Sequence, residues 1–143
     1  MNELERNKQV ALVHARHATD TEAAMAAVAP DVVWHGPAGS PRTLAAWKAR
    51  HERLLQAFEI TENRVDKVIA EGDLVFVEWS CQAVHRGSFL GIPATGRTVS
   101  LYGMYVERVR DGRVVEHWGL QDGMGLAAQL GGTPVLEAPR SSG

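Results

Sequence analysis

The sequence predicts an α+β domain in which N-terminal helices pack on a curved, mostly antiparallel sheet. Helix-forming stretches fill the first half, whereas the second half carries segments rich in Val, Trp, Tyr and Thr that alternate with tight-turn signals. The length of 143 residues, with 45% apolar and 22% charged residues, is typical of one folded domain. We expect a single domain over residues 1–132 and a flexible tail over residues 133–143, where Pro, Ser and Gly accumulate.

Three helices and one short strand are predicted in the first half. Residues 3–18 lack Pro and Gly and favour a first helix. Thr19 and Glu22 form a Thr-x-x-Glu capping box, which predicts a second helix that runs to the next proline. The short apolar run at residues 32–35 predicts a strand, and apolar residues that recur every three or four positions over residues 44–58 predict an amphipathic helix.

The second half has the pattern of an antiparallel meander. Three β-rich segments cover residues 60–70, 74–85 and 98–109. Gly72 and the Asp111-Gly112 pair supply the turn chemistry of tight hairpins. We therefore expect these strands to be neighbours in the sheet in the order of the chain.

Residues 114–126 organise the predicted site, because a strand runs there directly into a short helix over residues 123–130. On a strand Trp118, Leu120 and Asp122 point to the same face, so an acid lies beside two apolar side chains. Desolvation raises the pKa of a carboxyl group, which makes Asp122 a candidate general acid and base. Alternatively, Asp122 only caps the helix that follows it.

His85 is the second candidate catalytic residue. It ends the more apolar row of the strand at residues 74–85, and this row is expected to face the core. At the end of such a row an imidazole can bind a ligand oxygen or carry a proton, or it can lie at the rim in water. We expect a cavity between helices and sheet, lined by Trp34, His35, His85, Trp118 and Asp122.

The segment at residues 98–109 has apolar or aromatic side chains on both faces. Both faces can be buried if a helix covers one of them and a second subunit covers the other. The sequence therefore predicts a homodimer.

Charge and composition exclude several classes of partner. The net charge is −2 and the basic residues are scattered, so we expect no nucleic acid and no anionic membrane as partner. No apolar run approaches the ~20 residues of a membrane helix, and the polar N-terminus is no signal peptide, which predicts a cytoplasmic protein.

Metal binding is not expected either. The single Cys81 excludes an intrachain disulfide and a multi-thiolate zinc site, and it is expected in the core. His14 and His17 could share a helix face, but no third ligand lies at a telling spacing. His51 is read as a packing residue of its helix.

Two motifs carry a family resemblance. Residues 87–97 read Gly-Ser-Phe-Leu-Gly-Ile-Pro-Ala-Thr-Gly-Arg, and residues 110–118 read Arg-Asp-Gly-Arg-Val-Val-Glu-His-Trp. Asp122, Leu126 and the Gln-Leu-Gly at residues 129–131 follow. Together with the Trp-His-Gly-Pro run that starts at Trp34, this combination resembles the SnoaL-like polyketide cyclases, or ester cyclases, of the NTF2-like superfamily over most of residues 8 to 131.

The resemblance implies a usually dimeric cone with a hydrophobic cavity, no cofactor and a small hydrophobic, polyketide-like substrate. An aspartate on the last strand is the general acid/base of an intramolecular aldol ring closure in the antibiotic cyclases, and Asp122 is the matching position. His85 matches a strand histidine that often faces the cavity. The substrate-binding residues we expect are Trp34, His35, Trp47, Phe89, Tyr105 and Trp118.

Two other functions are compatible with the same residues. Asp122 and His85 could serve an isomerase, a dehydratase or an epoxide-opening enzyme, since each needs a proton relay in a dry pocket. Alternatively, the domain binds a ligand or dimerises without catalysis, and Asp122 only caps its helix.

Overall fold

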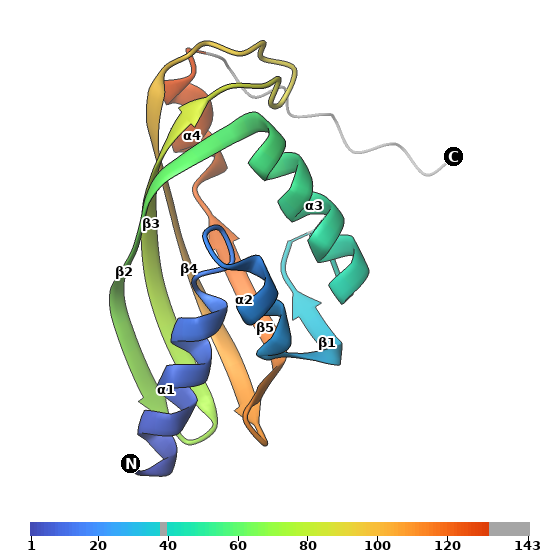
Figure 1. Cartoon of the computed structure of the whole chain (residues 1–143), viewed down its shortest axis with the longest axis vertical. Coiled ribbons are helices and arrows are strands. Elements are labelled where there is room, and N and C mark those ends of the chain that lie inside the picture. Colours follow the sequence, from blue (N-terminus) through green and yellow to red (C-terminus); the bar gives the residue numbers. More distant parts are fainter. Residues whose placement is uncertain (38–39, 132–143) are drawn as a thin grey trace.

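The sheet at the centre of the fold has five strands in the order β1-β5-β4-β3-β2. The computed structural model describes residues 1–37 and 40–131. The helices α1, α2 and α3 lie on one side of the curved sheet, and α4 lies at one end of it (Figure 1). The elements in chain order are α1 (Glu3–His14), α2 (Thr21–Ala26), β1 (Val28–His35), α3 (Leu44–Ala57), β2 (Phe58–Glu71), β3 (Leu74–His85), β4 (Thr98–Arg110), β5 (Arg113–Gln121) and α4 (Gly123–Gln129).

The predicted meander is confirmed, because β2 to β5 pair antiparallel in chain order. Gly72, Asp111 and Gly112 have φ of 58°, 50° and 75°, the left-handed backbone that tight hairpin turns require. The strand β1 adds to the edge of β5 in parallel. This α+β architecture is the predicted fold class.

The second helix starts one residue later than the capping box predicts. Asp20 is the N-cap, since its carboxylate accepts a hydrogen bond from the Ala23 backbone N–H, whereas the Thr19 hydroxyl donates to the Arg16 carbonyl. The strand after it begins early, at Val28, and contains Pro30. The proline is tolerated because the pairing with β5 shifts register between Val28 and Val33.

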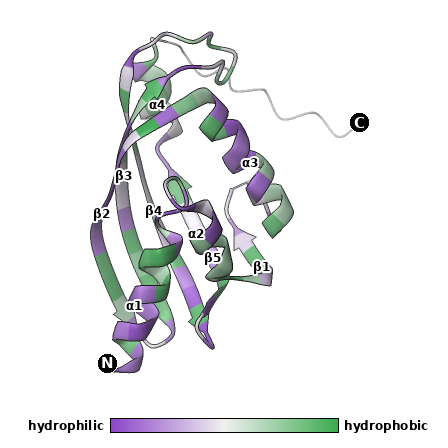
Figure 2. Cartoon of the chain, in the orientation of Figure 1, coloured by the Kyte–Doolittle hydropathy of each residue, from purple (hydrophilic) through white to green (hydrophobic). Residues whose placement is uncertain are grey.

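The inward row of β3 is the predicted one. Val75, Val77, Cys81 and Ala83 are buried, as is His85 at its end. One buried cluster gathers around Trp34 beneath α1, and another gathers around Phe58 beneath α4. Hydrophobic and hydrophilic positions alternate along the sheet accordingly (Figure 2). In the described ranges no helix has both the length and the apolar character to cross a membrane.

Candidate functional site

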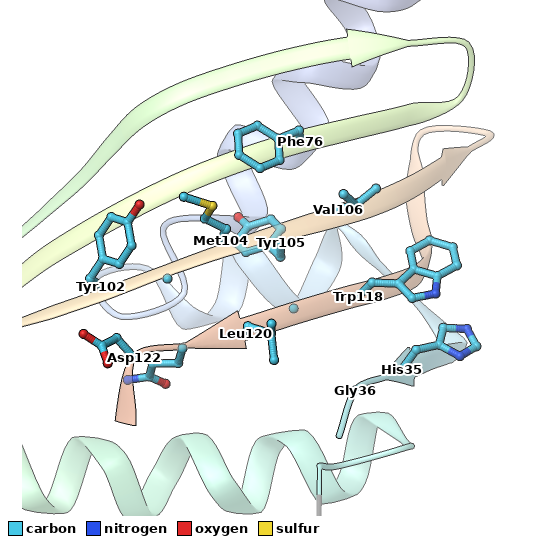
Figure 3. Close-up of a pocket in the computed structure, with 13 residues that line it drawn as sticks. His35, Gly36, Phe76, Tyr102, Met104, Tyr105, Val106, Trp118, Leu120 and Asp122 are labelled. Atoms are coloured by element: carbon cyan, nitrogen blue, oxygen red, sulfur yellow. The ribbon is translucent and has the colours of Figure 1, made fainter. Parts of the chain in front are cut away.

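Two hollows of similar size lie on the two faces of the sheet. The inner cavity, between the helices and the sheet, has a volume of about 610 Å³ and includes His17, Trp34, Trp47 and His117 among its lining residues. The outer hollow has a volume of about 590 Å³ and is lined by mainly apolar groups on the opposite face, including Phe76, Tyr102 and Trp118 (Figure 3). Both volumes suit a small organic ligand.

The face assignment of β5 is reversed relative to the sequence prediction. Trp118, Leu120 and Asp122 do share a face, but this face borders the outer hollow (Figure 3). His117 and Gly119, the alternate residues of the strand, line the inner cavity. The rule that the more apolar row faces inward fails here because the inward row carries an imidazole and a glycine.

Asp122 is exposed and caps α4. Its Oδ1 accepts a hydrogen bond of 2.8 Å from the Gly125 backbone N–H. The expected burial beside Trp118 is therefore wrong, and the predicted capping role is confirmed. The carboxylate is among the lining residues of the outer hollow and not of the inner cavity.

His85 is fully buried and is not among the lining residues of either hollow. Its Nδ1 accepts a hydrogen bond of 3.1 Å from the Thr95 backbone N–H, and its ring stacks on Phe58 at 5.2 Å between centroids. Neither the predicted cavity position nor the alternative position at a solvated rim is observed. The imidazole instead fixes the loop that carries the first family motif.

Five of the six predicted substrate-binding residues line the inner cavity, namely Trp34, His35, Trp47, Phe89 and Tyr105, and two of these, His35 and Tyr105, also line the outer hollow. Trp118 does not line the inner cavity, since it lies on the outer face with its ring stacked on His35 at 4.9 Å. Trp34 and Trp47 stack at 5.8 Å and form an aromatic wall of the cavity. His51 packs against this wall at 4.8 Å from Trp47, in agreement with its predicted packing role.

A buried carboxylate that the sequence reasoning missed lies next to the cavity. Glu107 on β4 is 0% exposed, and its Oε1 accepts hydrogen bonds from His14 Nδ1 on α1 and from His117 Nδ1 on β5, the latter at 3.1 Å. Burial alone would raise the pKa of Glu107, but the charge of His14 and the hydrogen bonds from both imidazoles lower it to about 2. The group is therefore an anion at neutral pH.

The surrounding titratable groups are mostly uncharged. Burial lowers the pKa of His17 to about 3, and the charge of His14 contributes to this shift. Burial also lowers the pKa of His117, although Glu107 partly offsets the effect. The pKa of Tyr105 lies well above its usual range because of burial and the charge of Glu107. Both His17 and His117 are thus neutral imidazoles near pH 7.

The residues that could hold a metal are His14, Glu107 and His117, whose donor atoms lie within 4.8 Å of one another. Two imidazoles and a carboxylate suit a divalent transition metal. Both imidazoles, however, direct Nδ1 to the same carboxylate oxygen, so the three side chains form a hydrogen-bonded cluster, in which His14 Nε2 and Glu107 Oε2 have no partner among the described residues. The absence of a metal and a cofactor stays a prediction.

One sequence signal could have revealed this cluster. The inward row of β4 contains Leu101, Gly103, Tyr105, Glu107 and Val109, and an acid within an apolar row needs a buried partner. Its partner His14 lies 93 positions away, so only the fold identifies it.

An α+β cone with an internal, aromatic-lined cavity defines a class of small-molecule-binding domains. The model of the SnoaL-like polyketide cyclase family matches residues 8–130. The chain belongs to this family and has its NTF2-like fold. It matches none of the curated proteins.

Solved structures support the same assignment. AclR of Streptomyces galilaeus, a proposed hydroxylase, shares 27% identity with a TM-score of 0.82, over 90% of this chain and 98% of AclR. IdmH of Streptomyces antibioticus, a proposed polyketide cyclase, shares 30% identity with a TM-score of 0.77, over 87% of this chain and 98% of IdmH. A proposed polyketide cyclase of Acidithiobacillus ferrooxidans shares 27% identity with a TM-score of 0.73, over 91% of this chain and 97% of that protein.

Proposed function

We propose that the protein closes a ring in a small hydrophobic, polyketide-like substrate by a cofactor-independent, intramolecular aldol-type reaction in the inner cavity. The observation that carries this proposal is an aromatic-lined cavity of about 610 Å³ beside a buried carboxylate and its imidazoles. A cavity walled by aromatic rings can hold a flexible chain in a near-attack shape. Family membership supports the same reaction class.

The chemistry requires one proton transfer in each direction. A base removes a proton from a C–H between carbonyls, a C–C bond forms, and the attacked carbonyl oxygen is protonated. The sequence-based hypothesis assigns both steps to Asp122, with help from His85. Because Asp122 borders the outer hollow and His85 lines neither hollow, the geometry favours groups of the inner cavity for these steps.

A synthetic poly-β-ketone methyl ester tests the proposal. Trp34, Trp47 and Trp79 line the inner cavity, so binding is expected to quench tryptophan fluorescence. An aldol product has the mass of the substrate, and it becomes a mass lower by one water if it dehydrates. The proposal fails if the protein neither accelerates cyclisation nor binds the ester. If the protein is instead an isomerase, a dehydratase or an epoxide-opening enzyme, a probe chosen for that reaction is converted to that reaction's product, which differs from the aldol product.

The role of Asp122 has its own test. The sequence-based hypothesis predicts that Asp122→Asn loses nearly all turnover while fold and ligand affinity are retained. An asparagine side chain can still cap α4, so a loss of stability does not obscure the result. Unchanged turnover removes Asp122 from the mechanism.

We also propose that the outer face forms a homodimer. Tyr102, Met104 and Leu120 are 38%, 40% and 68% exposed there, which is unusual for large apolar side chains on one face. A second copy would cover them. The variant Leu120→Lys places a charge in that interface and is expected to yield monomers by light scattering. A monomeric wild-type mass at micromolar concentration contradicts the proposal.

A further inference from the structure

We propose that His117 is the proton-transferring residue of the inner cavity and that Glu107 is its positioning residue. This assignment rests on the proposed function for its substrate class. One part of it, that the buried carboxylate of Glu107 holds His117 in one tautomer, can be tested without any substrate.

The hydrogen bond to Glu107 fixes the tautomer of His117. An ionised carboxylate can only accept hydrogen bonds, so His117 Nδ1, at 3.1 Å from Glu107 Oε1, carries the hydrogen. A neutral imidazole has one N–H, and its other nitrogen then holds a lone pair. His117 Nε2 is therefore the nitrogen that can accept a proton.

The His117 ring lies in the wall of the inner cavity, next to Gly119. His117 and Gly119 both line the inner cavity, and they are alternate residues of the inward row of β5. A Cβ on Gly119 would lie 2.7 Å from His117 Nε2. The Nε2 edge of the ring therefore packs against the Gly119 backbone, and a side chain at position 119 would displace the ring from its place in the cavity wall.

His117 is more exposed than the other two residues of the cluster, His14 and Glu107. The His117 side chain is 12% exposed, whereas those of His14 and Glu107 are 2% and 0% exposed. His14 Nε2 is buried and has no hydrogen-bond partner among the described residues. Although His14 also lines the inner cavity, His117 is the more exposed of the two imidazoles, and the ligand contact is assigned to it.

The proton balance of ring closure follows from this arrangement. His117 Nε2 takes the proton from a carbon that lies between two carbonyls, and the ring becomes an imidazolium stabilised by Glu107. The carbanion forms the C–C bond at a second carbonyl of the same substrate. The resulting alkoxide takes the proton back from Nε2, so His117 ends the cycle neutral.

The tautomer is measured by ¹⁵N NMR of the histidine side chains at neutral pH, with His117→Asn used to assign the signal. The proposal expects a neutral His117 with hydrogen on Nδ1, and a Glu107→Gln variant in which this preference weakens or is lost. A wild-type His117 with hydrogen on Nε2 alone overturns it. A shift of these signals only on addition of Zn²⁺ or Fe²⁺, with loss of the Nδ1 hydrogen, would indicate a metal centre and also overturns it.

Proton abstraction by His117 is measured with 5-nitrobenzisoxazole. This small aromatic probe opens to a coloured phenolate when a base removes its C3 proton. His117→Asn is expected to lower kcat by ~10²–10⁴ at unchanged KM, and Glu107→Gln is expected to lower kcat by a smaller factor. Glu116→Gln, on the outer face, is the control. An unchanged kcat in His117→Asn overturns the proposal, as does a bound probe that wild type does not open.

The two readouts separate failure of this inference from failure of the proposed function. If the tautomer and the probe reaction are as expected but the poly-β-ketone ester is not cyclised, the base stands and the reaction class is wrong. If the ester is cyclised by His117→Asn at the wild-type rate, the reaction class stands and the assignment of His117 is wrong.

Discussion

Replacing Glu107 with glutamine is expected to destabilise the fold strongly. The wild-type carboxylate is 0% exposed and accepts hydrogen bonds from His14 and His117 through one oxygen. Glutamine keeps the shape and one acceptor, but it loses the charge and adds a buried amide donor where Oε2 has no hydrogen-bond partner in the described part of the chain.

The size of the loss follows from these groups. Hydrogen bonds to charged groups contribute about 1.5–3 kcal/mol each, and a buried donor without a partner costs about 1–3 kcal/mol. Since glutamine retains part of the bonding, we expect the free energy of unfolding to fall by about 2–5 kcal/mol, out of a typical total of about 5–15 kcal/mol. Glu107 raises the pKa of His117, so in the variant that pKa falls further, and the loss grows once the pH falls below the pKa of His117 in the folded wild type, which itself lies below 6.5.

Urea unfolding followed by circular dichroism measures this loss, with Glu116→Gln as the matched control. Glu116 is also on this sheet and bonds His35 and Arg108 at 3.0 Å each, but its side chain is 32% exposed. The control is expected to lose at most about 1 kcal/mol. A loss below about 0.5 kcal/mol in Glu107→Gln, or equal losses in the two variants, would refute the assignment of a buried ionic cluster.

Three further predictions follow from the same contacts. Between pH 6.5 and about 3 the unfolded chain binds a proton at His17 that the folded chain does not bind. As the pH is lowered through this range, the free energy of unfolding should therefore fall by at least about 1.4 kcal/mol per pH unit; urea titrations that show no pH dependence contradict this. Asp122→Ala should cost about 1 kcal/mol through loss of the α4 cap, whereas Asp122→Asn should cost little; equal thermal unfolding of both variants would argue against the cap. Gly119→Ala should cost about 1–3 kcal/mol and slow the probe reaction, because its Cβ lies 2.7 Å from His117 Nε2; Gly123→Ala, with no atom within 4 Å of the new Cβ, is the control.

Most of the fold could be predicted because the signals are local. The strand β3 was placed at its observed bounds, since its alternating apolar row and the flanking turn residues depend only on neighbours in the chain. The glycines at the two hairpin turns have the predicted left-handed backbone. The start of β1 was missed because Pro30 is read as the end of a helix, whereas a break in the register accommodates it in the strand.

The site was harder to predict because its faces are set by tertiary contacts. Hydrophobicity alone predicts that the row with Trp118 and Leu120 faces the core, yet this row lies on the outer face. The inward row is held by the bond from His117 to Glu107, and the third member, His14, comes from the first helix. A pattern based on strand periodicity cannot detect a carboxylate that is paired across three elements.

A crystal structure with a bound, non-reactive poly-β-ketone analogue would locate the reaction. We expect the analogue in the inner cavity, with the carbon that would lose its proton at about 3–3.5 Å from His117 Nε2. An analogue in the outer hollow against the Asp122 carboxylate, with the inner cavity empty, would contradict it.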